Sequence, residues 1–254
     1  FQLRGNKLKK DGVLSLFTTL FFLFILSWFA AAISGVAGFG GALLLLPILT
    51  NMLGVKAAVP VLTIAQLFGN ASRIWFGRTE IKWQPVIYFI ITAIPFSIIG
   101  SLLFVDLPAK HILIGIGIFL IFIVIMRRQN VTHFNFGNKG LLLGGALTGF
   151  LSGIAGSAGP LGAAFFLGLD LSAISYIASE AVTALAMHIT KTIVYQKYAL
   201  IGAQELGYGI ILGIAMILGS WTGNKIAQKL SKDKFVLLVE ILLILSALHL
   251  IFLQ

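Results

Sequence analysis

Two short segments of this chain combine clustered glycines with serine hydroxyls inside otherwise apolar sequence. The segment 33–47 reads Ile-Ser-Gly-Val-Ala-Gly-Phe-Gly-Gly-Ala-Leu-Leu-Leu-Leu-Pro, and the segment 151–159 reads Leu-Ser-Gly-Ile-Ala-Gly-Ser-Ala-Gly. Glycine in a helix interior costs about 1 kcal/mol relative to alanine, so each cluster predicts a broken helix. The free backbone N–H groups and the positive dipole end of a broken helix can bind an anion.

Two polar clusters provide further groups that could contact such an anion. They are Asn70-Ala-Ser-Arg73 and His188-Ile-Thr-Lys191, and each closes an apolar segment just before a basic loop. Polar and ionisable groups at membrane depth are functional candidates by default. The predicted substrate-binding residues are Ser34, Gly38, Gly40, Gly41, Asn70, Arg73, Ser152, Gly156, Ser157, Gly159, His188 and Lys191. We predict no catalytic residue, no metal site and no cofactor.

These residue types also have structural interpretations. Arg73 and Lys191 lie near the ends of apolar segments, where long basic side chains reach the lipid headgroups. His188 can titrate near neutral pH or act as a packed, hydrogen-bonded core residue. Other glycines can simply let helices approach closely. We predict this packing role for Gly145-x-x-x-Gly149, Gly209-x-x-x-Gly213 and Gly219-x-x-x-Gly223.

Two acidic residues stand in apolar sequence, and either could carry a coupling proton. Glu180 precedes the run 181–186, and Glu240 lies within the last apolar segment. Neither has an acidic counterpart at the equivalent position of the other half. We favour structural roles, with Glu180 in the first turn of a helix and Glu240 as an interhelical hydrogen-bond partner.

The composition identifies an integral membrane protein. Of the 254 residues, 59% are hydrophobic and only 10% are charged, with a mean hydropathy of +1.03. A bilayer core of about 30 Å needs roughly 20 apolar residues per helical crossing, and the apolar stretches have this length rather than the alternation of barrel strands. The net charge of +10 fits loops that meet anionic lipid, and an anionic substrate more weakly; we predict no nucleic-acid partner.

The sequence pattern repeats at a spacing of 118 residues. Gly153 follows Gly35 at this distance, and the second polar cluster follows the first. We therefore predict an all-α polytopic membrane protein with about eight transmembrane segments in two homologous four-segment repeats, each with a glycine-broken first segment. The predicted boundaries are a polar N-terminal tail (1–12), repeat one (13–128), an inter-repeat loop (129–139) and repeat two (140–254), which together form one membrane domain.

The topology of the repeats has two alternatives. Four crossings per half would make the repeats parallel and place most Lys and Arg residues on one side, in agreement with the positive-inside rule. If each broken segment is instead a hairpin that returns to its own side, each half crosses three times and the repeats are inverted. The apolar stretch 13–52 is longer than one crossing needs, which favours the hairpin.

The first glycine segment resembles the TauE/SafE family of sulfite exporters and related anion transporters. The resemblance rests on Ser-Gly-x-x-Gly-x-Gly-Gly with Pro47 downstream, on its degenerate copy at 152–159, and on two hydrophobic halves. The copy differs at three positions, with Ala158 in place of a glycine, Pro160 after Gly159, and Phe165 opposite Pro47. The resemblance implies export of small sulfur-containing anions such as sulfite or sulfonates, energised by an ion or membrane gradient.

The predicted function is therefore secondary active anion export from a bacterial inner (plasma) membrane, with the lipid bilayer and a small anionic substrate as partners. A proton or sodium ion as coupling partner and a homo-oligomeric state stay open. An anion channel is the nearest alternative. An intramembrane hydrolase with Ser152 or Ser157 as nucleophile and His188 as base is the other, but the sequence lacks the motifs of known membrane proteases.

Overall fold

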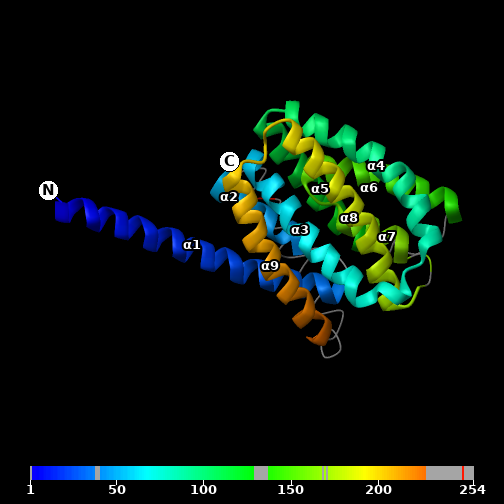
Figure 1. Ribbon diagram of the computed structural model, residues 1–254. Coiled ribbons are helices and arrows are strands. Elements are labelled where there is room, and N and C mark those ends of the chain that lie inside the picture. The colour runs from blue at the N-terminus through cyan, green and yellow to red at the C-terminus, as the bar shows by residue number, and fades with distance from the viewer. Residues whose placement is uncertain are drawn as a thin grey trace.

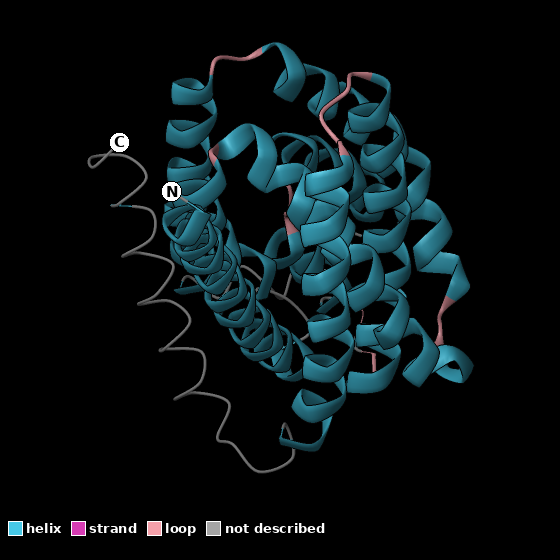
Figure 2. Ribbon diagram, turned by 60° about the vertical axis from the view of Figure 1, so that its left-hand side comes forward, coloured by secondary structure: helices cyan, strands magenta, loops and turns pink. Residues whose placement is uncertain are grey.

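The computed structural model describes residues 2–37, 41–128, 137–167, 169, 171–226 and 248, and this part of the chain is helical throughout its regular structure (Figure 2). Its elements are α1 (Gln2–Ala37), α2 (Gly41–Leu53), α3 (Val55–Gly77), the 3-10 helix η1 (Arg78–Glu80), α4 (Trp83–Asp106), α5 (Ala109–Arg128), α6 (Gly137–Ala155), α7 (Gly159–Leu167), α8 (Ala173–Lys197) and α9 (Ala203–Ile226). The predicted all-α class is confirmed. Of the last predicted segment, only residue 248 is described, so the predicted role of Glu240 lies outside the described residues.

Three helices within the described residues are long and apolar enough to cross a membrane. They include Thr18–Gly35, Trp83–Asp106 and Ala203–Gly223, while Leu44–Leu53 and Ala109–Phe119 are shorter apolar stretches. Helices α3 and α8 are similarly long, with 23 and 25 residues. Both carry polar residues that are buried in the bundle, and these residues lower the mean hydropathy of the two helices.

Two segments predicted to lie outside the repeats, the N-terminal tail and the inter-repeat loop, contain helical residues in the structure. Residues 2–12, predicted as a polar tail, are the first turns of α1. This helix has 36 residues and is about 54 Å long at 1.5 Å per residue, so its N-terminal part projects well beyond the bundle (Figure 1). Of the predicted inter-repeat loop, 129–136 lies outside the described residues and 137–139 begins α6.

Both glycine-rich segments interrupt the helix, and the chain folds back at each interruption. A Cβ atom at Gly41, the first residue of α2, would lie 2.1 Å from the carbonyl oxygen of Ala30 in α1. In α7, the ring of Phe165 lies against Gly144, which is in the early part of α6. Each broken segment is therefore a helical hairpin. Helix α7 has only nine residues, and Pro160 fits its first turn because a proline there sacrifices no helical hydrogen bond.

The helices exchange partners between the two halves of the chain (Figure 1). Helix α1 packs on α9, and α6 packs on α4, so each hairpin contacts a helix from the other half. Helices α3 and α8 pack on each other, and they also pack on α9 and α4, respectively. The two halves thus share one interior.

Glycine makes the closest of these contacts possible. In Gly145-x-x-x-Gly149, a Cβ atom at either glycine would lie within 2.3 Å of a backbone oxygen of α4. In Gly219-x-x-x-Gly223, it would lie within 2.2 Å of a backbone oxygen of α1, and in Gly209-x-x-x-Gly213 it would lie within 2.6 Å of a side chain of α3. The packing role predicted for the three motifs is confirmed.

The helix ends repeat at the spacing found in the sequence. Helix α6 ends 118 residues after α1, α7 begins 118 residues after α2, and α8 begins 118 residues after α3 (155 − 37, 159 − 41 and 173 − 55). Helix α9 begins 120 residues after α4 (203 − 83). The same order of long helix, break, short helix and long helix therefore occurs twice.

Candidate functional site

The break between α6 and α7 is held by two side chains of α8. The Lys191 ammonium group donates hydrogen bonds to the carbonyl oxygen of Gly156 (2.5 Å), to the hydroxyl oxygen of Ser152 (2.9 Å) and to the carbonyl oxygen of Ser152 (3.3 Å). One turn further along α8, the Tyr195 hydroxyl donates to the carbonyl oxygen of Gly153 (2.8 Å). The last carbonyl groups of a helix lack intrahelical partners, and here α8 provides them.

This arrangement requires both the buried lysine and the glycine at the break. Lys191 is fully buried, so its side chain lies inside the bundle and the alternative in which it reaches lipid headgroups is wrong. Gly156 has a φ of +76°, in the left-handed region that L side chains rarely adopt. The left-handed turn directs its carbonyl oxygen toward Lys191.

Helix α3 presents a stripe of three buried polar residues to the interior. Gln66, Asn70 and Arg73 are spaced four and three residues apart, which places them on one face of the helix. The Asn70 side chain donates to the carbonyl oxygen of Gln66 (2.9 Å), and its oxygen accepts a hydrogen bond from the Arg73 guanidinium. Arg73 is 9% exposed, so it also points inward rather than toward lipid headgroups.

Helix α8 brings Glu180 and His188 to the same interior. The Glu180 carboxylate lies 3.5 Å from Nη1 of Arg73, and the two side chains are 3% and 9% exposed. Glu180 is the eighth residue of α8, so the predicted first-turn position is wrong. His188 is buried two turns further along, and its Nδ1 atom has no hydrogen-bond partner within the described part of the chain.

These groups border a small central cavity between the two breaks. Its volume of about 20 Å³ is room for about one water molecule. The lining residues are Ser34, Ala42, Gln66, Asn70, Arg73, Ser152, Ser157, Ala158, Gly159, Glu180, Ala184, Met187 and His188. Ala42, the second residue of α2, and Gly159, the first residue of α7, belong to this lining, so the N-termini of both short helices border the cavity.

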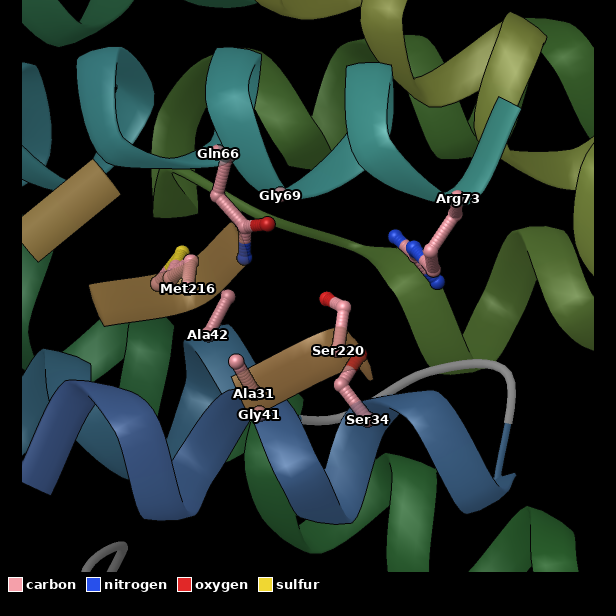
Figure 3. Close-up of a pocket in the computed structure, with 9 residues that line it drawn as sticks. All are labelled: Ala31, Ser34, Gly41, Ala42, Gln66, Gly69, Arg73, Met216 and Ser220. Atoms are coloured by element: carbon pink, nitrogen blue, oxygen red, sulfur yellow. The ribbon is translucent and has the colours of Figure 1, made fainter. Parts of the chain in front are cut away.

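Arg73 borders two further cavities besides the central one. One, of about 10 Å³, lies between α1, α2, α3 and α9, and Figure 3 shows Gln66 and Arg73 reaching into it from α3, on the opposite side from Ser34 of α1. The other, of about 70 Å³, lies where the end of α3 meets the start of α8, and its lining includes Phe76 and Ile174. The guanidinium thus stands at the junction of three spaces.

Most of the predicted substrate-binding residues gather around this junction. The structure brings Ser34, Asn70, Arg73, Ser152, Ser157, Gly159 and His188 to the central cavity and Gly41 to the adjoining one. Lys191 and Gly156 are joined to each other by a hydrogen bond, next to Ser152 of the cavity lining. Gly38 and Gly40 lie outside the described residues.

Sequence reasoning missed Gln66 and did not include Glu180 among the site residues. Both line the central cavity. A polar stripe at helical spacing on α3 could have identified Gln66, because it lies one turn before Asn70. For Glu180, the signal was a charged residue eight positions before His188, on the same helix face.

The fold and the cavity define a polytopic helical membrane protein with a buried polar site at two broken helices. The chain matches the model of the sulfite exporter TauE/SafE family over residues 23–250. Since this match covers most of the chain, the protein belongs to the TauE/SafE sulfite exporter family. No curated protein and no solved structure matches the chain.

Proposed function

We propose that this protein is a secondary active transporter that exports small sulfur-containing anions, such as sulfite and sulfonates, through the central cavity. The observation that carries the proposal is the convergence of a buried arginine and two helix N-termini on one cavity. Membership of the TauE/SafE family supports the substrate class. Buried cationic groups are rare in membrane helices and are concentrated along substrate pathways.

The cavity lining has the chemistry that an oxyanion requires. The Arg73 guanidinium can donate two parallel hydrogen bonds to neighbouring oxygens of a sulfonate or sulfite group. Ser34 and Ser157 can add hydroxyl donors, and Nδ1 of His188 at the same cavity has no hydrogen-bond partner among the described residues. The N-termini of α2 and α7 add positive dipole ends, which favour negative charge at close range.

The size of the cavity indicates an occluded conformation. A space of about 20 Å³ is too small for a sulfur oxyanion, which is several times larger than a water molecule. Helix motion must therefore open the cavity to admit the substrate. The 70 Å³ cavity beside Phe76 is the larger neighbouring space, and it meets the central cavity at Arg73, so we assign the entry route to this side.

We also propose that the chain is a duplication with inverted repeats. The equal spacing of helix ends and the exchange of hairpins between halves support two equivalent units. Each hairpin returns toward its own starting side. In the first half α3, α4 and α5 follow the hairpin as three crossings, so the second half begins on the opposite side of the membrane. Rocking of such halves against each other is a common route to alternating access.

The hydrolase alternative with Ser152 as nucleophile is disfavoured by the hydrogen bonds of Lys191. Ser152 pairs with Lys191 rather than with His188. The three hydrogen bonds from Lys191 occupy all three donors of an ammonium group, so its nitrogen has no lone pair with which to activate a serine. Within the described part of the chain, Ser152 therefore has no general base among its hydrogen-bond partners.

The decisive experiment is counterflow of labelled sulfite in liposomes that contain the purified protein. A carrier exchanges labelled for unlabelled anion with saturation, and sulfonates on the trans side accelerate the exchange. A flux that does not saturate with sulfite concentration and that is unaffected by anions on the trans side would identify a channel instead. Absence of any sulfite flux would contradict both readings.

Two arginine variants connect the flux to the cavity. Arg73→Gln removes the buried charge and is expected to lower exchange by about tenfold or more, because a hydrogen bond to a charged group contributes about 1.5–3 kcal/mol. Arg78→Gln is the matched control, since Arg78 is exposed and stacks on Trp75 outside the cavity. Equal exchange by both variants would contradict a site at Arg73.

A further inference from the structure

The ion pair between Arg73 and Glu180 is loosely built for two buried charges. Hydrogen bonds between such charged groups are about 2.7–2.9 Å long, whereas Nη1 of Arg73 lies 3.5 Å from Oε2 of Glu180. This carboxylate oxygen accepts no hydrogen bond from the described residues. A buried carboxylate normally has its oxygens fully hydrogen-bonded, so the position of Glu180 needs an explanation beyond fold stability.

Both partners of this pair line the central cavity, on opposite helices. Arg73 comes from α3 and Glu180 from α8, and the remaining cavity between them and His188 has room for about one water molecule. Within the central cavity, a sulfonate or sulfite group that bound the guanidinium would meet the Glu180 carboxylate, which lines the same cavity and lies 3.5 Å from Nη1 of Arg73. Anion and carboxylate carry the same charge, so placing both against one guanidinium in a space of low dielectric is unfavourable.

We propose that Glu180 is a tethered competitor of the transported anion. In the occluded state without substrate, its carboxylate occupies Arg73; when an anion binds, it takes this place and the carboxylate moves away. Return of Glu180 to Arg73 then helps to expel the anion. The inference rests on the proposed function, since it assigns Glu180 a role at the same site.

The proposal predicts that removing the Glu180 carboxylate, although it lines the site, strengthens anion binding. Glu180→Gln keeps the size of the side chain and removes its charge. The Kd for methanesulfonate, an anion that stays singly charged across the accessible pH range, is expected to fall by about tenfold, the change that corresponds to losing one charged competitor. The double variant Arg73→Gln/Glu180→Gln is expected to lose this gain.

The measurement is isothermal titration of methanesulfonate and of sulfite into the full-length protein in detergent. Glu80→Gln is the control for net charge, because Glu80 is exposed in η1 and lies outside the cavity lining. Its Kd is expected to equal that of the wild type. Since Glu180→Gln leaves a buried arginine without its counter-ion, Glu180→Asp is measured as well; its shorter side chain holds the carboxylate further from Arg73, and a smaller fall in Kd is expected.

The possible results separate this inference from the function on which it rests. A lower Kd in Glu180→Gln or Glu180→Asp, absent in the double variant, supports the competitor. Wild-type binding with an unchanged or higher Kd in both Glu180 variants would overturn the competitor and leave the transporter proposal intact. No binding by the wild type or any variant would overturn the proposed substrate class, and this inference with it.

Discussion

Lys191 on α8 lies 2.5 Å from the carbonyl oxygen of Gly156, so one buried ammonium group closes the gap that the second break leaves at the end of α6. The residue at the equivalent position of the first half, Arg73, pairs instead with Asn70 and with Glu180 across the cavity. The two halves thus place a cation at the same point of the repeat and give it different partners. The second break is fixed to α8, whereas Arg73 faces the space where an anion could bind.

Replacing Lys191 should destabilise the whole bundle. Lys191→Met leaves the acceptors on Ser152 and Gly156 buried without a donor, and each unsatisfied group costs about 1–3 kcal/mol. We expect the free energy of unfolding to fall by about 3 kcal/mol or more, measured by thermal unfolding in detergent. Lys197→Met, at an exposed position of the same helix, should change it by less than about 0.5 kcal/mol. Similar losses in both variants would show that Lys191 does not support the break.

Tyr195 should contribute less than Lys191 at the same break. Tyr195→Phe keeps the ring, whose centroid lies 5.3 Å from that of Phe104, and removes the hydroxyl group that donates the hydrogen bond to Gly153. The expected loss is about 1 kcal/mol, followed by the same unfolding assay. Tyr198→Phe changes a 44% exposed side chain and serves as the control. Equal unfolding temperatures for Tyr195→Phe and Tyr198→Phe would show that the hydrogen bond to Gly153 does not contribute to stability.

Two glycines on the helices should respond to alanine in opposite directions. At Gly100, a Cβ atom would lie 2.2 Å from the carbonyl oxygen of Phe150, so Gly100→Ala must push α4 away from α6 and lower the unfolding temperature. At Gly207 on α9, no atom lies within 4 Å of such a Cβ. Gly207→Ala should therefore stabilise the helix by up to about 1 kcal/mol. A stable Gly100→Ala variant would contradict the close α4–α6 contact.

The inverted topology can be tested directly because the chain has no cysteine. A single cysteine at Lys7 or at Lys139 can be labelled with a membrane-impermeant maleimide in right-side-out and inside-out vesicles. Three crossings per half predict that the two positions react from opposite sides of the membrane. Labelling of both from one side would favour four crossings and parallel repeats.

The amino-acid sequence by itself determined the class of the protein and the plan of its chain. Composition required membrane helices, because a chain with 59% hydrophobic residues cannot cover itself with a polar surface. The glycine clusters placed both breaks, since a run of glycines disfavours a helix whatever surrounds it. The spacing of 118 residues likewise anticipated the positions at which the helices end.

Only the tertiary structure decided which polar side chains meet. Whether a broken segment folds back or continues depends on contacts such as that of Phe165 with Gly144, which join residues of different helices. Glu180 and Arg73 are separated by more than a hundred residues, and no local pattern pairs them across the cavity. Lys191 and Arg73 occupy equivalent positions in the two halves of the sequence. The packing of α8 on α6 gave Lys191 a structural role, whereas Arg73 lies at the cavity. Their roles differ because a buried charge is tolerated only where its particular surroundings provide partners.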